Sequence, residues 1–314
     1  MQPRNGCLAG SASSQLMGCE TRAGLTYAVL TVVLFAWSPV LVRLAAPLSP
    51  LAISFGRLAV AGGTLFLLGL ARGSNLRVSG RESLTFALYG LVLALHFLLY
   101  IASLQLTSIA HSLSLVYTAP IFTTAFSVWY LKEPISPRSY WGIALAVVGV
   151  SVLAGWEPAI SARTLLGDLL ALGSAICFGG YSVIGRRVRD RYELAKYAFY
   201  VYSSGALWLL PLALLVPGEP AGVQPLLAVV ALGMFPLAIG HTLYNASLRR
   251  MHAARVNLIA TQEVTGGILL GYLVLAESPT PQSLLGALLT MAGVAFVLCT
   301  TSSESSLQPI GPRR

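Results

Sequence analysis

Charged residues are scarce in this chain: only 10% of its 314 residues are Asp, Glu, Lys or Arg, whereas about a quarter is usual for a soluble domain. Apolar residues make up 56% of the sequence, and the mean hydropathy is +0.75. Together these values exclude an ordinary water-soluble fold. They predict a protein that is embedded in a lipid bilayer.

Several functional motifs are also missing. The sequence contains no G-x-x-x-x-G-K-[ST] loop, so we expect no ATP-driven step. It has neither an Asp-rich motif nor the paired histidines of metal-assisted membrane enzymes. The four cysteines have no spacing typical of a metal site or a disulfide framework. We therefore predict that the protein is not an enzyme, has no catalytic residues, and binds no metal and no cofactor.

The net charge of +9 raises the question of an anionic partner such as nucleic acid. The basic residues lie in short clusters between apolar runs, however, and such clusters are typical anchors that set the topology of a membrane protein. We therefore expect contact with a lipid bilayer and no nucleic-acid partner.

Ten apolar runs follow the N-terminal segment, each near the 17 to 25 residues that a helix needs to cross about 30 Å of hydrocarbon. They cover about residues 24–45, 51–71, 83–104, 108–131, 139–156, 167–185, 197–216, 223–248, 254–276 and 282–300. Continuous apolar runs must close their own backbone hydrogen bonds as helices. The predicted fold class is an all-α integral membrane protein with ten transmembrane helices.

The sequence also contains an internal duplication, which we looked for before any other fold assignment. Pairs of identical residues at an offset of 144 include Tyr100 and Tyr244, Glu133 and Glu277, Gly142 and Gly286, and Gly149 and Gly293. Pairs at an offset of 143 include Gly24 and Gly167, Phe35 and Phe178, and Arg43 and Arg186. Each copy holds five spans, an odd number, so the second copy must cross the bilayer in the opposite direction. Such inverted repeats commonly enclose a central substrate site and suit alternating access.

The duplication divides the chain into five expected segments. They are a disordered cytoplasmic tail (1–22), a first five-helix repeat (23–156), a linker loop (157–166), a second five-helix repeat (167–300) and a cytoplasmic tail (301–314). The N-terminal tail lacks the apolar core of a signal peptide. Placing the N-terminus in the cytoplasm puts nearly all Lys and Arg residues on that side, as the positive-inside rule requires. We therefore predict that both termini are cytoplasmic.

One short motif occupies matching places in the two halves: Leu131-Lys132-Glu133 and Leu275-Ala276-Glu277 lie at the ends of the fourth and ninth spans. The first half also has Pro120 in the fourth span and Arg57, within Phe55-Gly56-Arg57-Leu58, in the second. Over about residues 24–300 this pattern resembles the EamA branch of the drug/metabolite transporter superfamily. The resemblance implies a multi-pass carrier of small metabolites in the cell (cytoplasmic or inner) membrane. Where the family often has Glu-Pro in the ninth helix, this chain has Glu263-Val264, so the proline that would kink this helix is absent.

Two charged residues are predicted inside the spans. Arg57 lies about two turns into the second span and Glu263 about nine residues into the ninth. A charge at the centre of a membrane helix costs about 2.5 to 3.5 kcal/mol on insertion scales, so such residues usually face a watery cavity or pair with each other. Either Arg57 holds a substrate carboxylate or phosphate while Glu263 meets an ammonium group or exchanges a proton, or the two residues form an ion pair that fixes the second helix against the ninth.

Polar and aromatic residues complete the candidate cavity. His96 and His241 each lie one turn before a repeated tyrosine, Tyr100 or Tyr244. An imidazole at such a place either relays protons or serves as a neutral hydrogen-bonding partner between helices. The full set of candidate substrate-binding residues is Arg57, His96, Tyr100, Tyr117, Tyr244, Gln262 and Glu263.

Glu133 and Glu277 are predicted at opposite faces of the membrane. A carboxylate at the end of a helix can accept hydrogen bonds from backbone N–H groups of the following turn and so fix the corner. The alternative is a gating role, in which each acid closes its own side.

From these patterns we predict a secondary transporter that moves a small organic metabolite by alternating access. Amino acids or related metabolites are the expected exported substrates, because one cation and one anion in a cavity complement a zwitterion. The alternatives are a drug efflux carrier driven by protons through Glu263, and a structural or signalling bundle without transport. A coupling proton remains an open option, and the sequence does not determine the oligomeric state.

Overall fold

The computed structural model describes residues 7–74, 77–131, 137–155, 161–188, 192–215, 222–248, 250, 256 and 259–305. Every regular element in these ranges is a helix. The elements are α1 (Cys7–Leu44), α2 (Pro50–Ala71), α3 (Gly80–Leu106), α4 (Ile109–Val116), α5 (Ala119–Leu131), α6 (Ser139–Gly155), α7 (Ala162–Val188), α8 (Leu194–Leu215), α9 (Val223–Leu232), the π-helix η1 (Gly233–His241), α10 (Thr242–Leu248), α12 (Gln262–Leu275) and α13 (Pro281–Ser305). The predicted all-α fold class is therefore confirmed.

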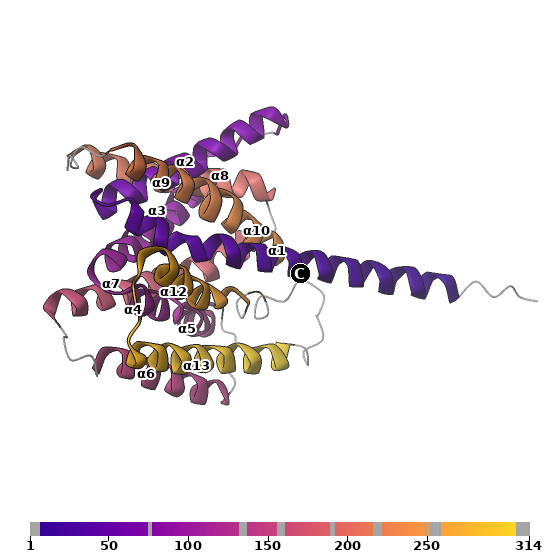
Figure 1. Cartoon of the computed structure of the whole chain (residues 1–314). Helices are drawn as coiled ribbons and strands as arrows, with labels where there is room; N and C mark the ends of the chain where they lie inside the picture. The colour runs from indigo at the N-terminus through magenta and orange to yellow at the C-terminus, as the bar shows by residue number, and fades with distance from the viewer. Residues whose placement is uncertain are drawn as a thin grey trace, which may run out of the picture.

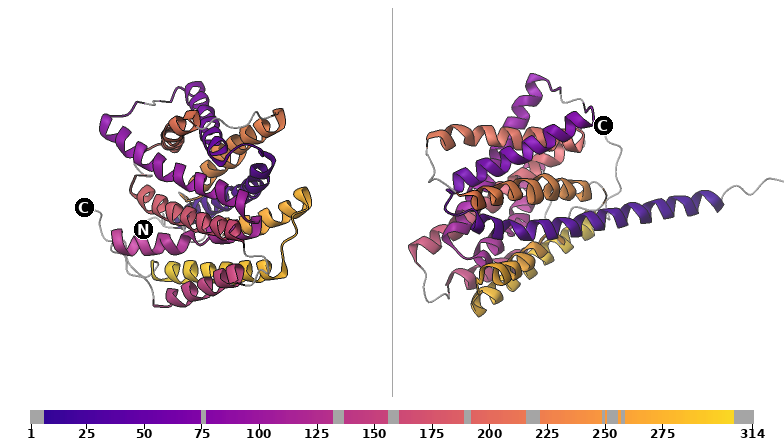
Figure 2. Two further views of the ribbon diagram at one scale, coloured as in Figure 1. Left: turned by 90° about the vertical axis from the view of Figure 1, so that its left-hand side faces the viewer. Right: turned by 45° about the horizontal axis from the view of Figure 1, so that its top comes forward.

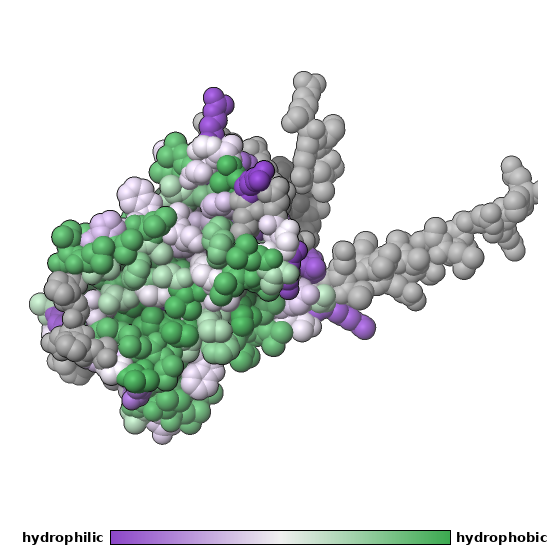
Figure 3. All heavy atoms as spheres, turned by 90° about the horizontal axis from the view of Figure 1, so that it is seen from above, coloured by the Kyte–Doolittle hydropathy of each residue, from purple (hydrophilic) through white to green (hydrophobic). Residues whose placement is uncertain are grey.

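Seven helical segments in the described ranges are long and apolar enough to cross a membrane, and three shorter apolar helices accompany them. The shorter ones are Ser139–Val152, Gln262–Leu275 and Pro281–Val297. Each of the ten predicted runs therefore contains a helix. Large apolar side chains cover much of the outer surface (Figure 3), and Trp141, for example, is 76% exposed. Such a continuous apolar surface is suited to lipid rather than to water.

Serine caps determine where three helices of the first half begin. Ser49 and Ser108 each accept a hydrogen bond from the backbone N–H three residues further on, and Ser79 forms a capping box with Glu82. These bonds satisfy donors that would otherwise be left unpaired in the first turn of each helix. The cap at Ser108 matters most for the site, because it fixes the start of the short helix α4.

Two membrane segments are interrupted at matching places in the two halves. The break between α4 and α5 lies at Tyr117 and Thr118, just before Pro120, which has no backbone N–H to continue a helix. In the second half the chain turns at Thr261, 144 residues after Tyr117, and α12 begins at the next residue. This second break forms although Val264 occupies the place that matches Pro120. Broken helices at corresponding depths are the feature expected of a transport site.

The two halves meet along α6 and α13, which lie side by side in Figures 1 and 2. A Cβ atom on Gly142 would lie 2.7 Å from the carbonyl oxygen of Gly293, and one on Gly149 would lie 2.9 Å from that of Gly286. We call these four residues the glycine seam. Gly142 and Gly286 are repeat partners, and so are Gly149 and Gly293. Exchanging each glycine for its repeat partner therefore turns one contact into the other, which is the pattern that a two-fold axis produces. The contacts also run in opposite directions along the two helices, so α6 and α13 are antiparallel, as an inverted repeat requires.

The other contacts between the halves have the same symmetry: a helix of one half packs against helices of the other half, and its repeat partner makes the matching contacts. In the first half α1 packs against α12 and against the α9–η1–α10 unit, and in the second half the equivalent helix α7 packs against α5, α4 and α3. Helix α2 packs against its counterpart α8. The main hydrophobic core therefore lies between the two copies and not within either of them.

The helix α1 enters the bundle from the side on which α13 ends (right in Figure 1). It begins at Cys7, so residues 7–22 are helical in the structure, whereas their composition suggested a disordered tail. This stretch contains no proline to interrupt a helix that continues from the first span. Residues 1–6 and 306–314, with residues 157–160 of the expected linker, lie outside the described residues.

Candidate functional site

A cavity lies between the two halves at the level of the helix breaks. It has about 60 Å³ of free space, which is room for only a few water molecules. Its walls come from α1 to α5 in the first half and from α7, η1, α10 and α12 in the second, with Ala260 just before α12. Six of the seven candidate residues line it, namely Arg57, His96, Tyr100, Tyr117, Tyr244 and Glu263.

The structure does not bring the seventh candidate, Gln262, to the cavity. Its side chain is exposed, whereas only 6% of Glu263 is exposed. Successive residues of an α-helix point about 100° apart, so the turn that directs Glu263 inward directs Gln262 outward. A periodicity argument applied from the break at Thr261 would have separated the two residues.

The start of α12 positions Glu263. This acid lies in the first turn of the helix, where the partial positive charge of the N-terminus stabilises a carboxylate. It accepts a hydrogen bond from the hydroxyl of Tyr117, which lies at the break between α4 and α5. The two interrupted helices therefore face each other across the cavity through this bond.

Arg57 is almost wholly buried on α2, with 1% of the residue exposed. Its guanidinium carbon Cζ lies 3.9 Å from the centre of the Phe97 ring, a cation–π contact. Within the described part of the chain, Nε and Nη1 have no hydrogen-bond partner. Each unpaired buried donor costs about 1 to 3 kcal/mol, and more on a charged group. Unpaired donors at a cavity wall are therefore a sign of a site that a ligand or water completes.

Arg57 and Glu263 line the same cavity without forming an ion pair. Among the described residues no nitrogen–oxygen contact within 4.0 Å joins them, although their charges attract each other across the cavity. The direct pair that the sequence left open is therefore absent in this conformation. A cation and an anion are both left facing a small, largely apolar space.

Two similar sets of aromatic residues line the cavity, and each set combines residues from both halves. One set is His96, Tyr100 and Phe178, and the other is His241, Tyr244 and Phe35. The ring centres of Phe178 and His96 are 4.8 Å apart, and those of Phe35 and His241 are 4.5 Å apart. The two phenylalanines were not proposed for the site, but they are repeat partners, and that match was the signal in the sequence.

The two histidines make different contacts. Nδ1 of His96 lies 2.8 Å from the hydroxyl of Ser174 on α7, and this hydroxyl also donates to the backbone carbonyl of His96 at 3.0 Å. These bonds tie α3 to α7, which is the role of a hydrogen-bonding partner between helices. His241 makes ring contacts instead, including an edge-on contact with Phe97 at 5.6 Å.

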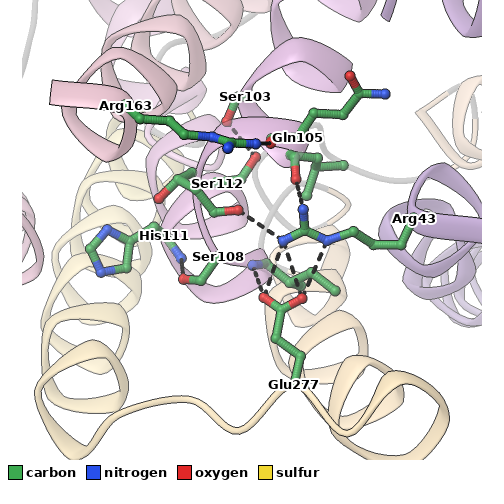
Figure 4. Close-up of polar contacts among 11 residues, drawn as sticks. Arg43, Ser103, Gln105, Ser108, His111, Ser112, Arg163 and Glu277 are labelled. Atoms are coloured by element: carbon green, nitrogen blue, oxygen red, sulfur yellow. Dashed lines mark hydrogen bonds and ion pairs between the residues drawn. The ribbon is translucent and has the colours of Figure 1, made fainter. Parts of the chain in front are cut away.

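A second polar cluster, which sequence reasoning did not assemble, joins the ends of α1 and α12 (Figure 4). Nη2 of Arg43 lies 3.1 Å from Oε2 of Glu277, and the guanidinium also donates to the carbonyls of Leu104 and Thr107. Oε1 of Glu277 accepts a hydrogen bond of 2.6 Å from the N–H of Ile109 at the start of α4. We call this cluster the Arg43–Glu277 latch. The expected bond from Glu277 to its own following turn is replaced by one to a different helix, while Glu133 lies outside the described residues.

Replacing Glu277 with glutamine tests whether the latch closes the cavity or only fixes a corner. The two side chains are 26% and 25% exposed, so solvent screens the pair and we expect a loss of only about 1 kcal/mol in stability. If the latch closes the cavity, a cysteine introduced at Tyr117 in a cysteine-free background will react faster with a thiol reagent in the E277Q variant. Equal reaction rates with and without E277Q would leave Glu277 a purely structural role. The R43Q variant should behave as E277Q does.

Comparison with known proteins places the chain among transporters. A model of the EamA-like transporter family matches residues 22–155 and again residues 165–299. The threonine/homoserine exporter RhtA of Escherichia coli (strain K12) is 27% identical over 257 residues, which cover 81% of this chain and 84% of that protein. A probable terminal-alkyne amino-acid exporter of Streptantibioticus cattleyicolor is 27% identical over 185 residues, which cover 58% of this chain and 62% of that protein. A crystal structure of a protein with 21% identity matches 93% of this chain with a TM-score of 0.65, which shows a shared fold.

Proposed function

Because this chain belongs to the EamA-like transporter family, we propose that it exports amino acids or closely related zwitterionic metabolites by alternating access. The observation that carries the proposal is that one cavity is lined by Arg57, two of whose nitrogens have no partner among the described residues, and by the carboxylic acid Glu263, without a direct ion pair between them. Two relatives whose names describe amino-acid exporters support the same substrate class.

In the proposed complex, the substrate carboxylate accepts hydrogen bonds from Nε and Nη1 of Arg57. Bonds between charged groups of this kind are about twice as strong as neutral ones. The substrate ammonium group meets Glu263 and competes there with the hydroxyl of Tyr117. Substrate binding would therefore weaken the hydrogen bond between Tyr117 and Glu263, which joins the two interrupted helices. The relative position of these helices would then depend on whether the cavity is occupied.

The conformation described here is too tight for an amino acid, since the cavity has room for only a few water molecules. Binding would require the halves to separate on one side. The proposed movement turns one half against the other about the glycine seam, where backbones touch and little adjustment is possible. The Arg43–Glu277 latch would then hold one end of the cavity shut in the present conformation.

We also propose that the two halves, 23–156 and 167–300, act as the moving units, with both termini in the cytoplasm. The clusters of Lys and Arg between spans support this orientation. Reporter fusions at each end provide the test, and ends on opposite sides of the membrane would contradict the proposal.

Counterflow in proteoliposomes tests the substrate class. Vesicles that contain the purified protein and unlabelled threonine should take up external labelled threonine faster than protein-free vesicles. Labelled glucose, with unlabelled glucose inside the vesicles, serves as a control and should show no such uptake. Uptake of glucose without uptake of any amino acid would exclude the amino-acid proposal.

Proton-coupled efflux of aromatic drugs is the second candidate, and the phenylalanines that line the cavity favour it. Phe35, Phe97 and Phe178 offer ring surfaces on which a planar cation can stack, and Glu263 would supply the matching anion. Counterflow of a fluorescent aromatic cation in the same vesicles, in the absence of amino-acid counterflow, would favour this function.

A further inference from the structure

A buried histidine–aspartate pair lies between α4 and α7, outside the cavity. Nδ1 of His111 is 3.2 Å from one carboxylate oxygen of Asp168 and 3.3 Å from the other. Only 1% of His111 and 6% of Asp168 are exposed, and neither residue lines the cavity. The two residues lie near the starts of their apolar runs (108–131 and 167–185), where a polar residue is ordinary, so their burial could not be predicted from the apolar pattern.

The charge of this pair depends on a single proton. An imidazolium ion facing a carboxylate makes the pair electrically neutral, whereas a neutral imidazole leaves a net charge of −1. A net charge is far harder to bury than a neutral pair, because the surroundings cannot replace the lost hydration. The buried arrangement of His111 and Asp168 is therefore best accommodated with the proton bound.

Two charged side chains that the structure describes at this end of the bundle, Arg163 and Glu277, are bonded to groups other than Asp168. Arg163, five residues earlier on α7, is exposed and donates to a backbone carbonyl of α3 at 3.1 Å. At the α12–α13 corner, Glu277 is paired with Arg43. Figure 4 shows the ring of His111 directed away from that pair.

Several titratable groups that the structure describes on the other helices packed against α4 and α7 are bonded elsewhere or exposed. On α3, the titratable His96 is bonded to Ser174, six residues beyond Asp168 along α7. On α12, Glu263 is bonded to Tyr117 beyond the opposite end of α4. Among the side chains that the structure describes on α5, α6 and α13, the remaining titratable groups are the exposed Tyr130, Tyr140 and Cys299.

The helix α4 connects this pair to both the latch and the cavity. The N–H of Ile109 is bonded to Glu277 of the latch, and eight residues later the hydroxyl of Tyr117 is bonded to Glu263. At a rise of 1.5 Å per residue this distance is about 12 Å. A displacement of α4 that opens the latch would bring water to His111 and would move Tyr117 in the same step.

We propose that His111 and Asp168 form the binding site of the coupling proton, a proposal that rests on the transport function proposed above. The imidazole accepts one proton from a hydronium ion: the N–H bond forms as an O–H bond of the hydronium breaks, and a water molecule is released. The neutral pair then favours the closed conformation, whereas loss of the proton favours one in which water reaches the carboxylate. Proton and substrate thus act on the same conformational equilibrium from two separate sites, which is what coupling between sites means.

The test uses the full chain and the variants Asp168→Asn and His111→Asn in proteoliposomes, with threonine as the probe. Threonine counterflow without a pH gradient reports substrate exchange, and threonine accumulation under an imposed pH gradient reports coupling. For one-to-one exchange, wild-type accumulation should change about tenfold for each pH unit. Both variants should keep counterflow within about threefold of wild type and lose the response to the gradient. Arg163→Gln, which changes an exposed charge on the same helix, should keep both.

Each other outcome has a defined meaning. A gradient response that persists in both variants would overturn the proton site. Wild-type counterflow without any gradient response would also overturn it, but the proposed amino-acid transport would stand in that case. Absence of wild-type counterflow would instead contradict the proposed function. If neither variant folds, a pH-indicator dye in weakly buffered detergent solution decides, because threonine should change the number of protons bound to the wild-type protein. No change on threonine binding would overturn the proposal.

Discussion

Replacing Arg57 with leucine is expected to abolish transport and to leave the protein at least as stable as wild type. Two guanidinium nitrogens of Arg57 have no protein partner in the described structure, so leucine removes an unsatisfied buried charge. Replacing buried charges with apolar side chains is often neutral or stabilising. Loss of a charged partner of the substrate typically costs 2 to 5 kcal/mol, so threonine counterflow should fall by at least about 30-fold. Counterflow and the apparent melting temperature of the purified protein measure the two effects.

The companion variant Glu263→Gln should also lose counterflow, since an amide cannot neutralise the substrate ammonium group. Thr265→Ala, at an exposed position on the same helix, serves as the matched control and should transport normally. The ion-pair alternative makes the opposite forecast for stability, because breaking a buried pair would lower the melting temperature in R57L and E263Q alike. A marked fall in stability with transport retained would refute the cavity role of both residues.

Replacing Gly293 with valine should prevent correct folding of most of the protein. A Cβ atom at this position would lie 2.4 Å from the backbone nitrogen of Ala146 and 2.6 Å from the carbonyl oxygen of Gly142. Both atoms belong to the backbone of α6, so they cannot move aside as a flexible side chain would. Overpacking of a tight core typically costs about 1 to 3 kcal/mol and occasionally more, and contact with backbone places this variant at the upper end. The yield of monodisperse protein and its melting temperature measure the loss.

A matched glycine separates this steric effect from a general effect of helix glycines. A Cβ atom at Gly63 on α2 would meet nothing within 4 Å, so Gly63→Ala should be neutral or stabilising by up to about 1 kcal/mol. Gly149→Val should behave like Gly293→Val, because its Cβ atom would lie 2.4 Å from the backbone nitrogen of Thr290. Normal folding of both seam variants would show that the two helices can separate without loss.

The features that were predicted from the sequence are those that a single stretch or a fixed offset reveals. Apolar runs marked the helices, because each helix must bury its own backbone in lipid. The offset of 144 residues identified the duplication. Arg57 and Glu263 were identified because a charge inside an apolar run is rare, and the structure places both on one cavity.

The features that were missed depend on which residues meet after folding. Arg43 and Glu277 are 234 residues apart, and His111 and Asp168 are 57 apart, so no local pattern joins either pair. Gln262 was included because hydropathy does not reveal which face of a helix points inward. The break at Thr261 could not be predicted either, since the proline that usually signals such a break is absent.

The glycine seam has a consequence for how a protein of this kind can arise. Gly142 contacts the repeat partner of Gly149, and Gly149 contacts the repeat partner of Gly142. A single five-helix chain therefore already contains both glycines that the contact between two copies needs. Two such chains inserted in opposite orientations could meet through the same glycines before any gene fusion. After fusion, a bulkier residue acquired by either copy would also obstruct the other, so the two copies cannot diverge independently at this joint.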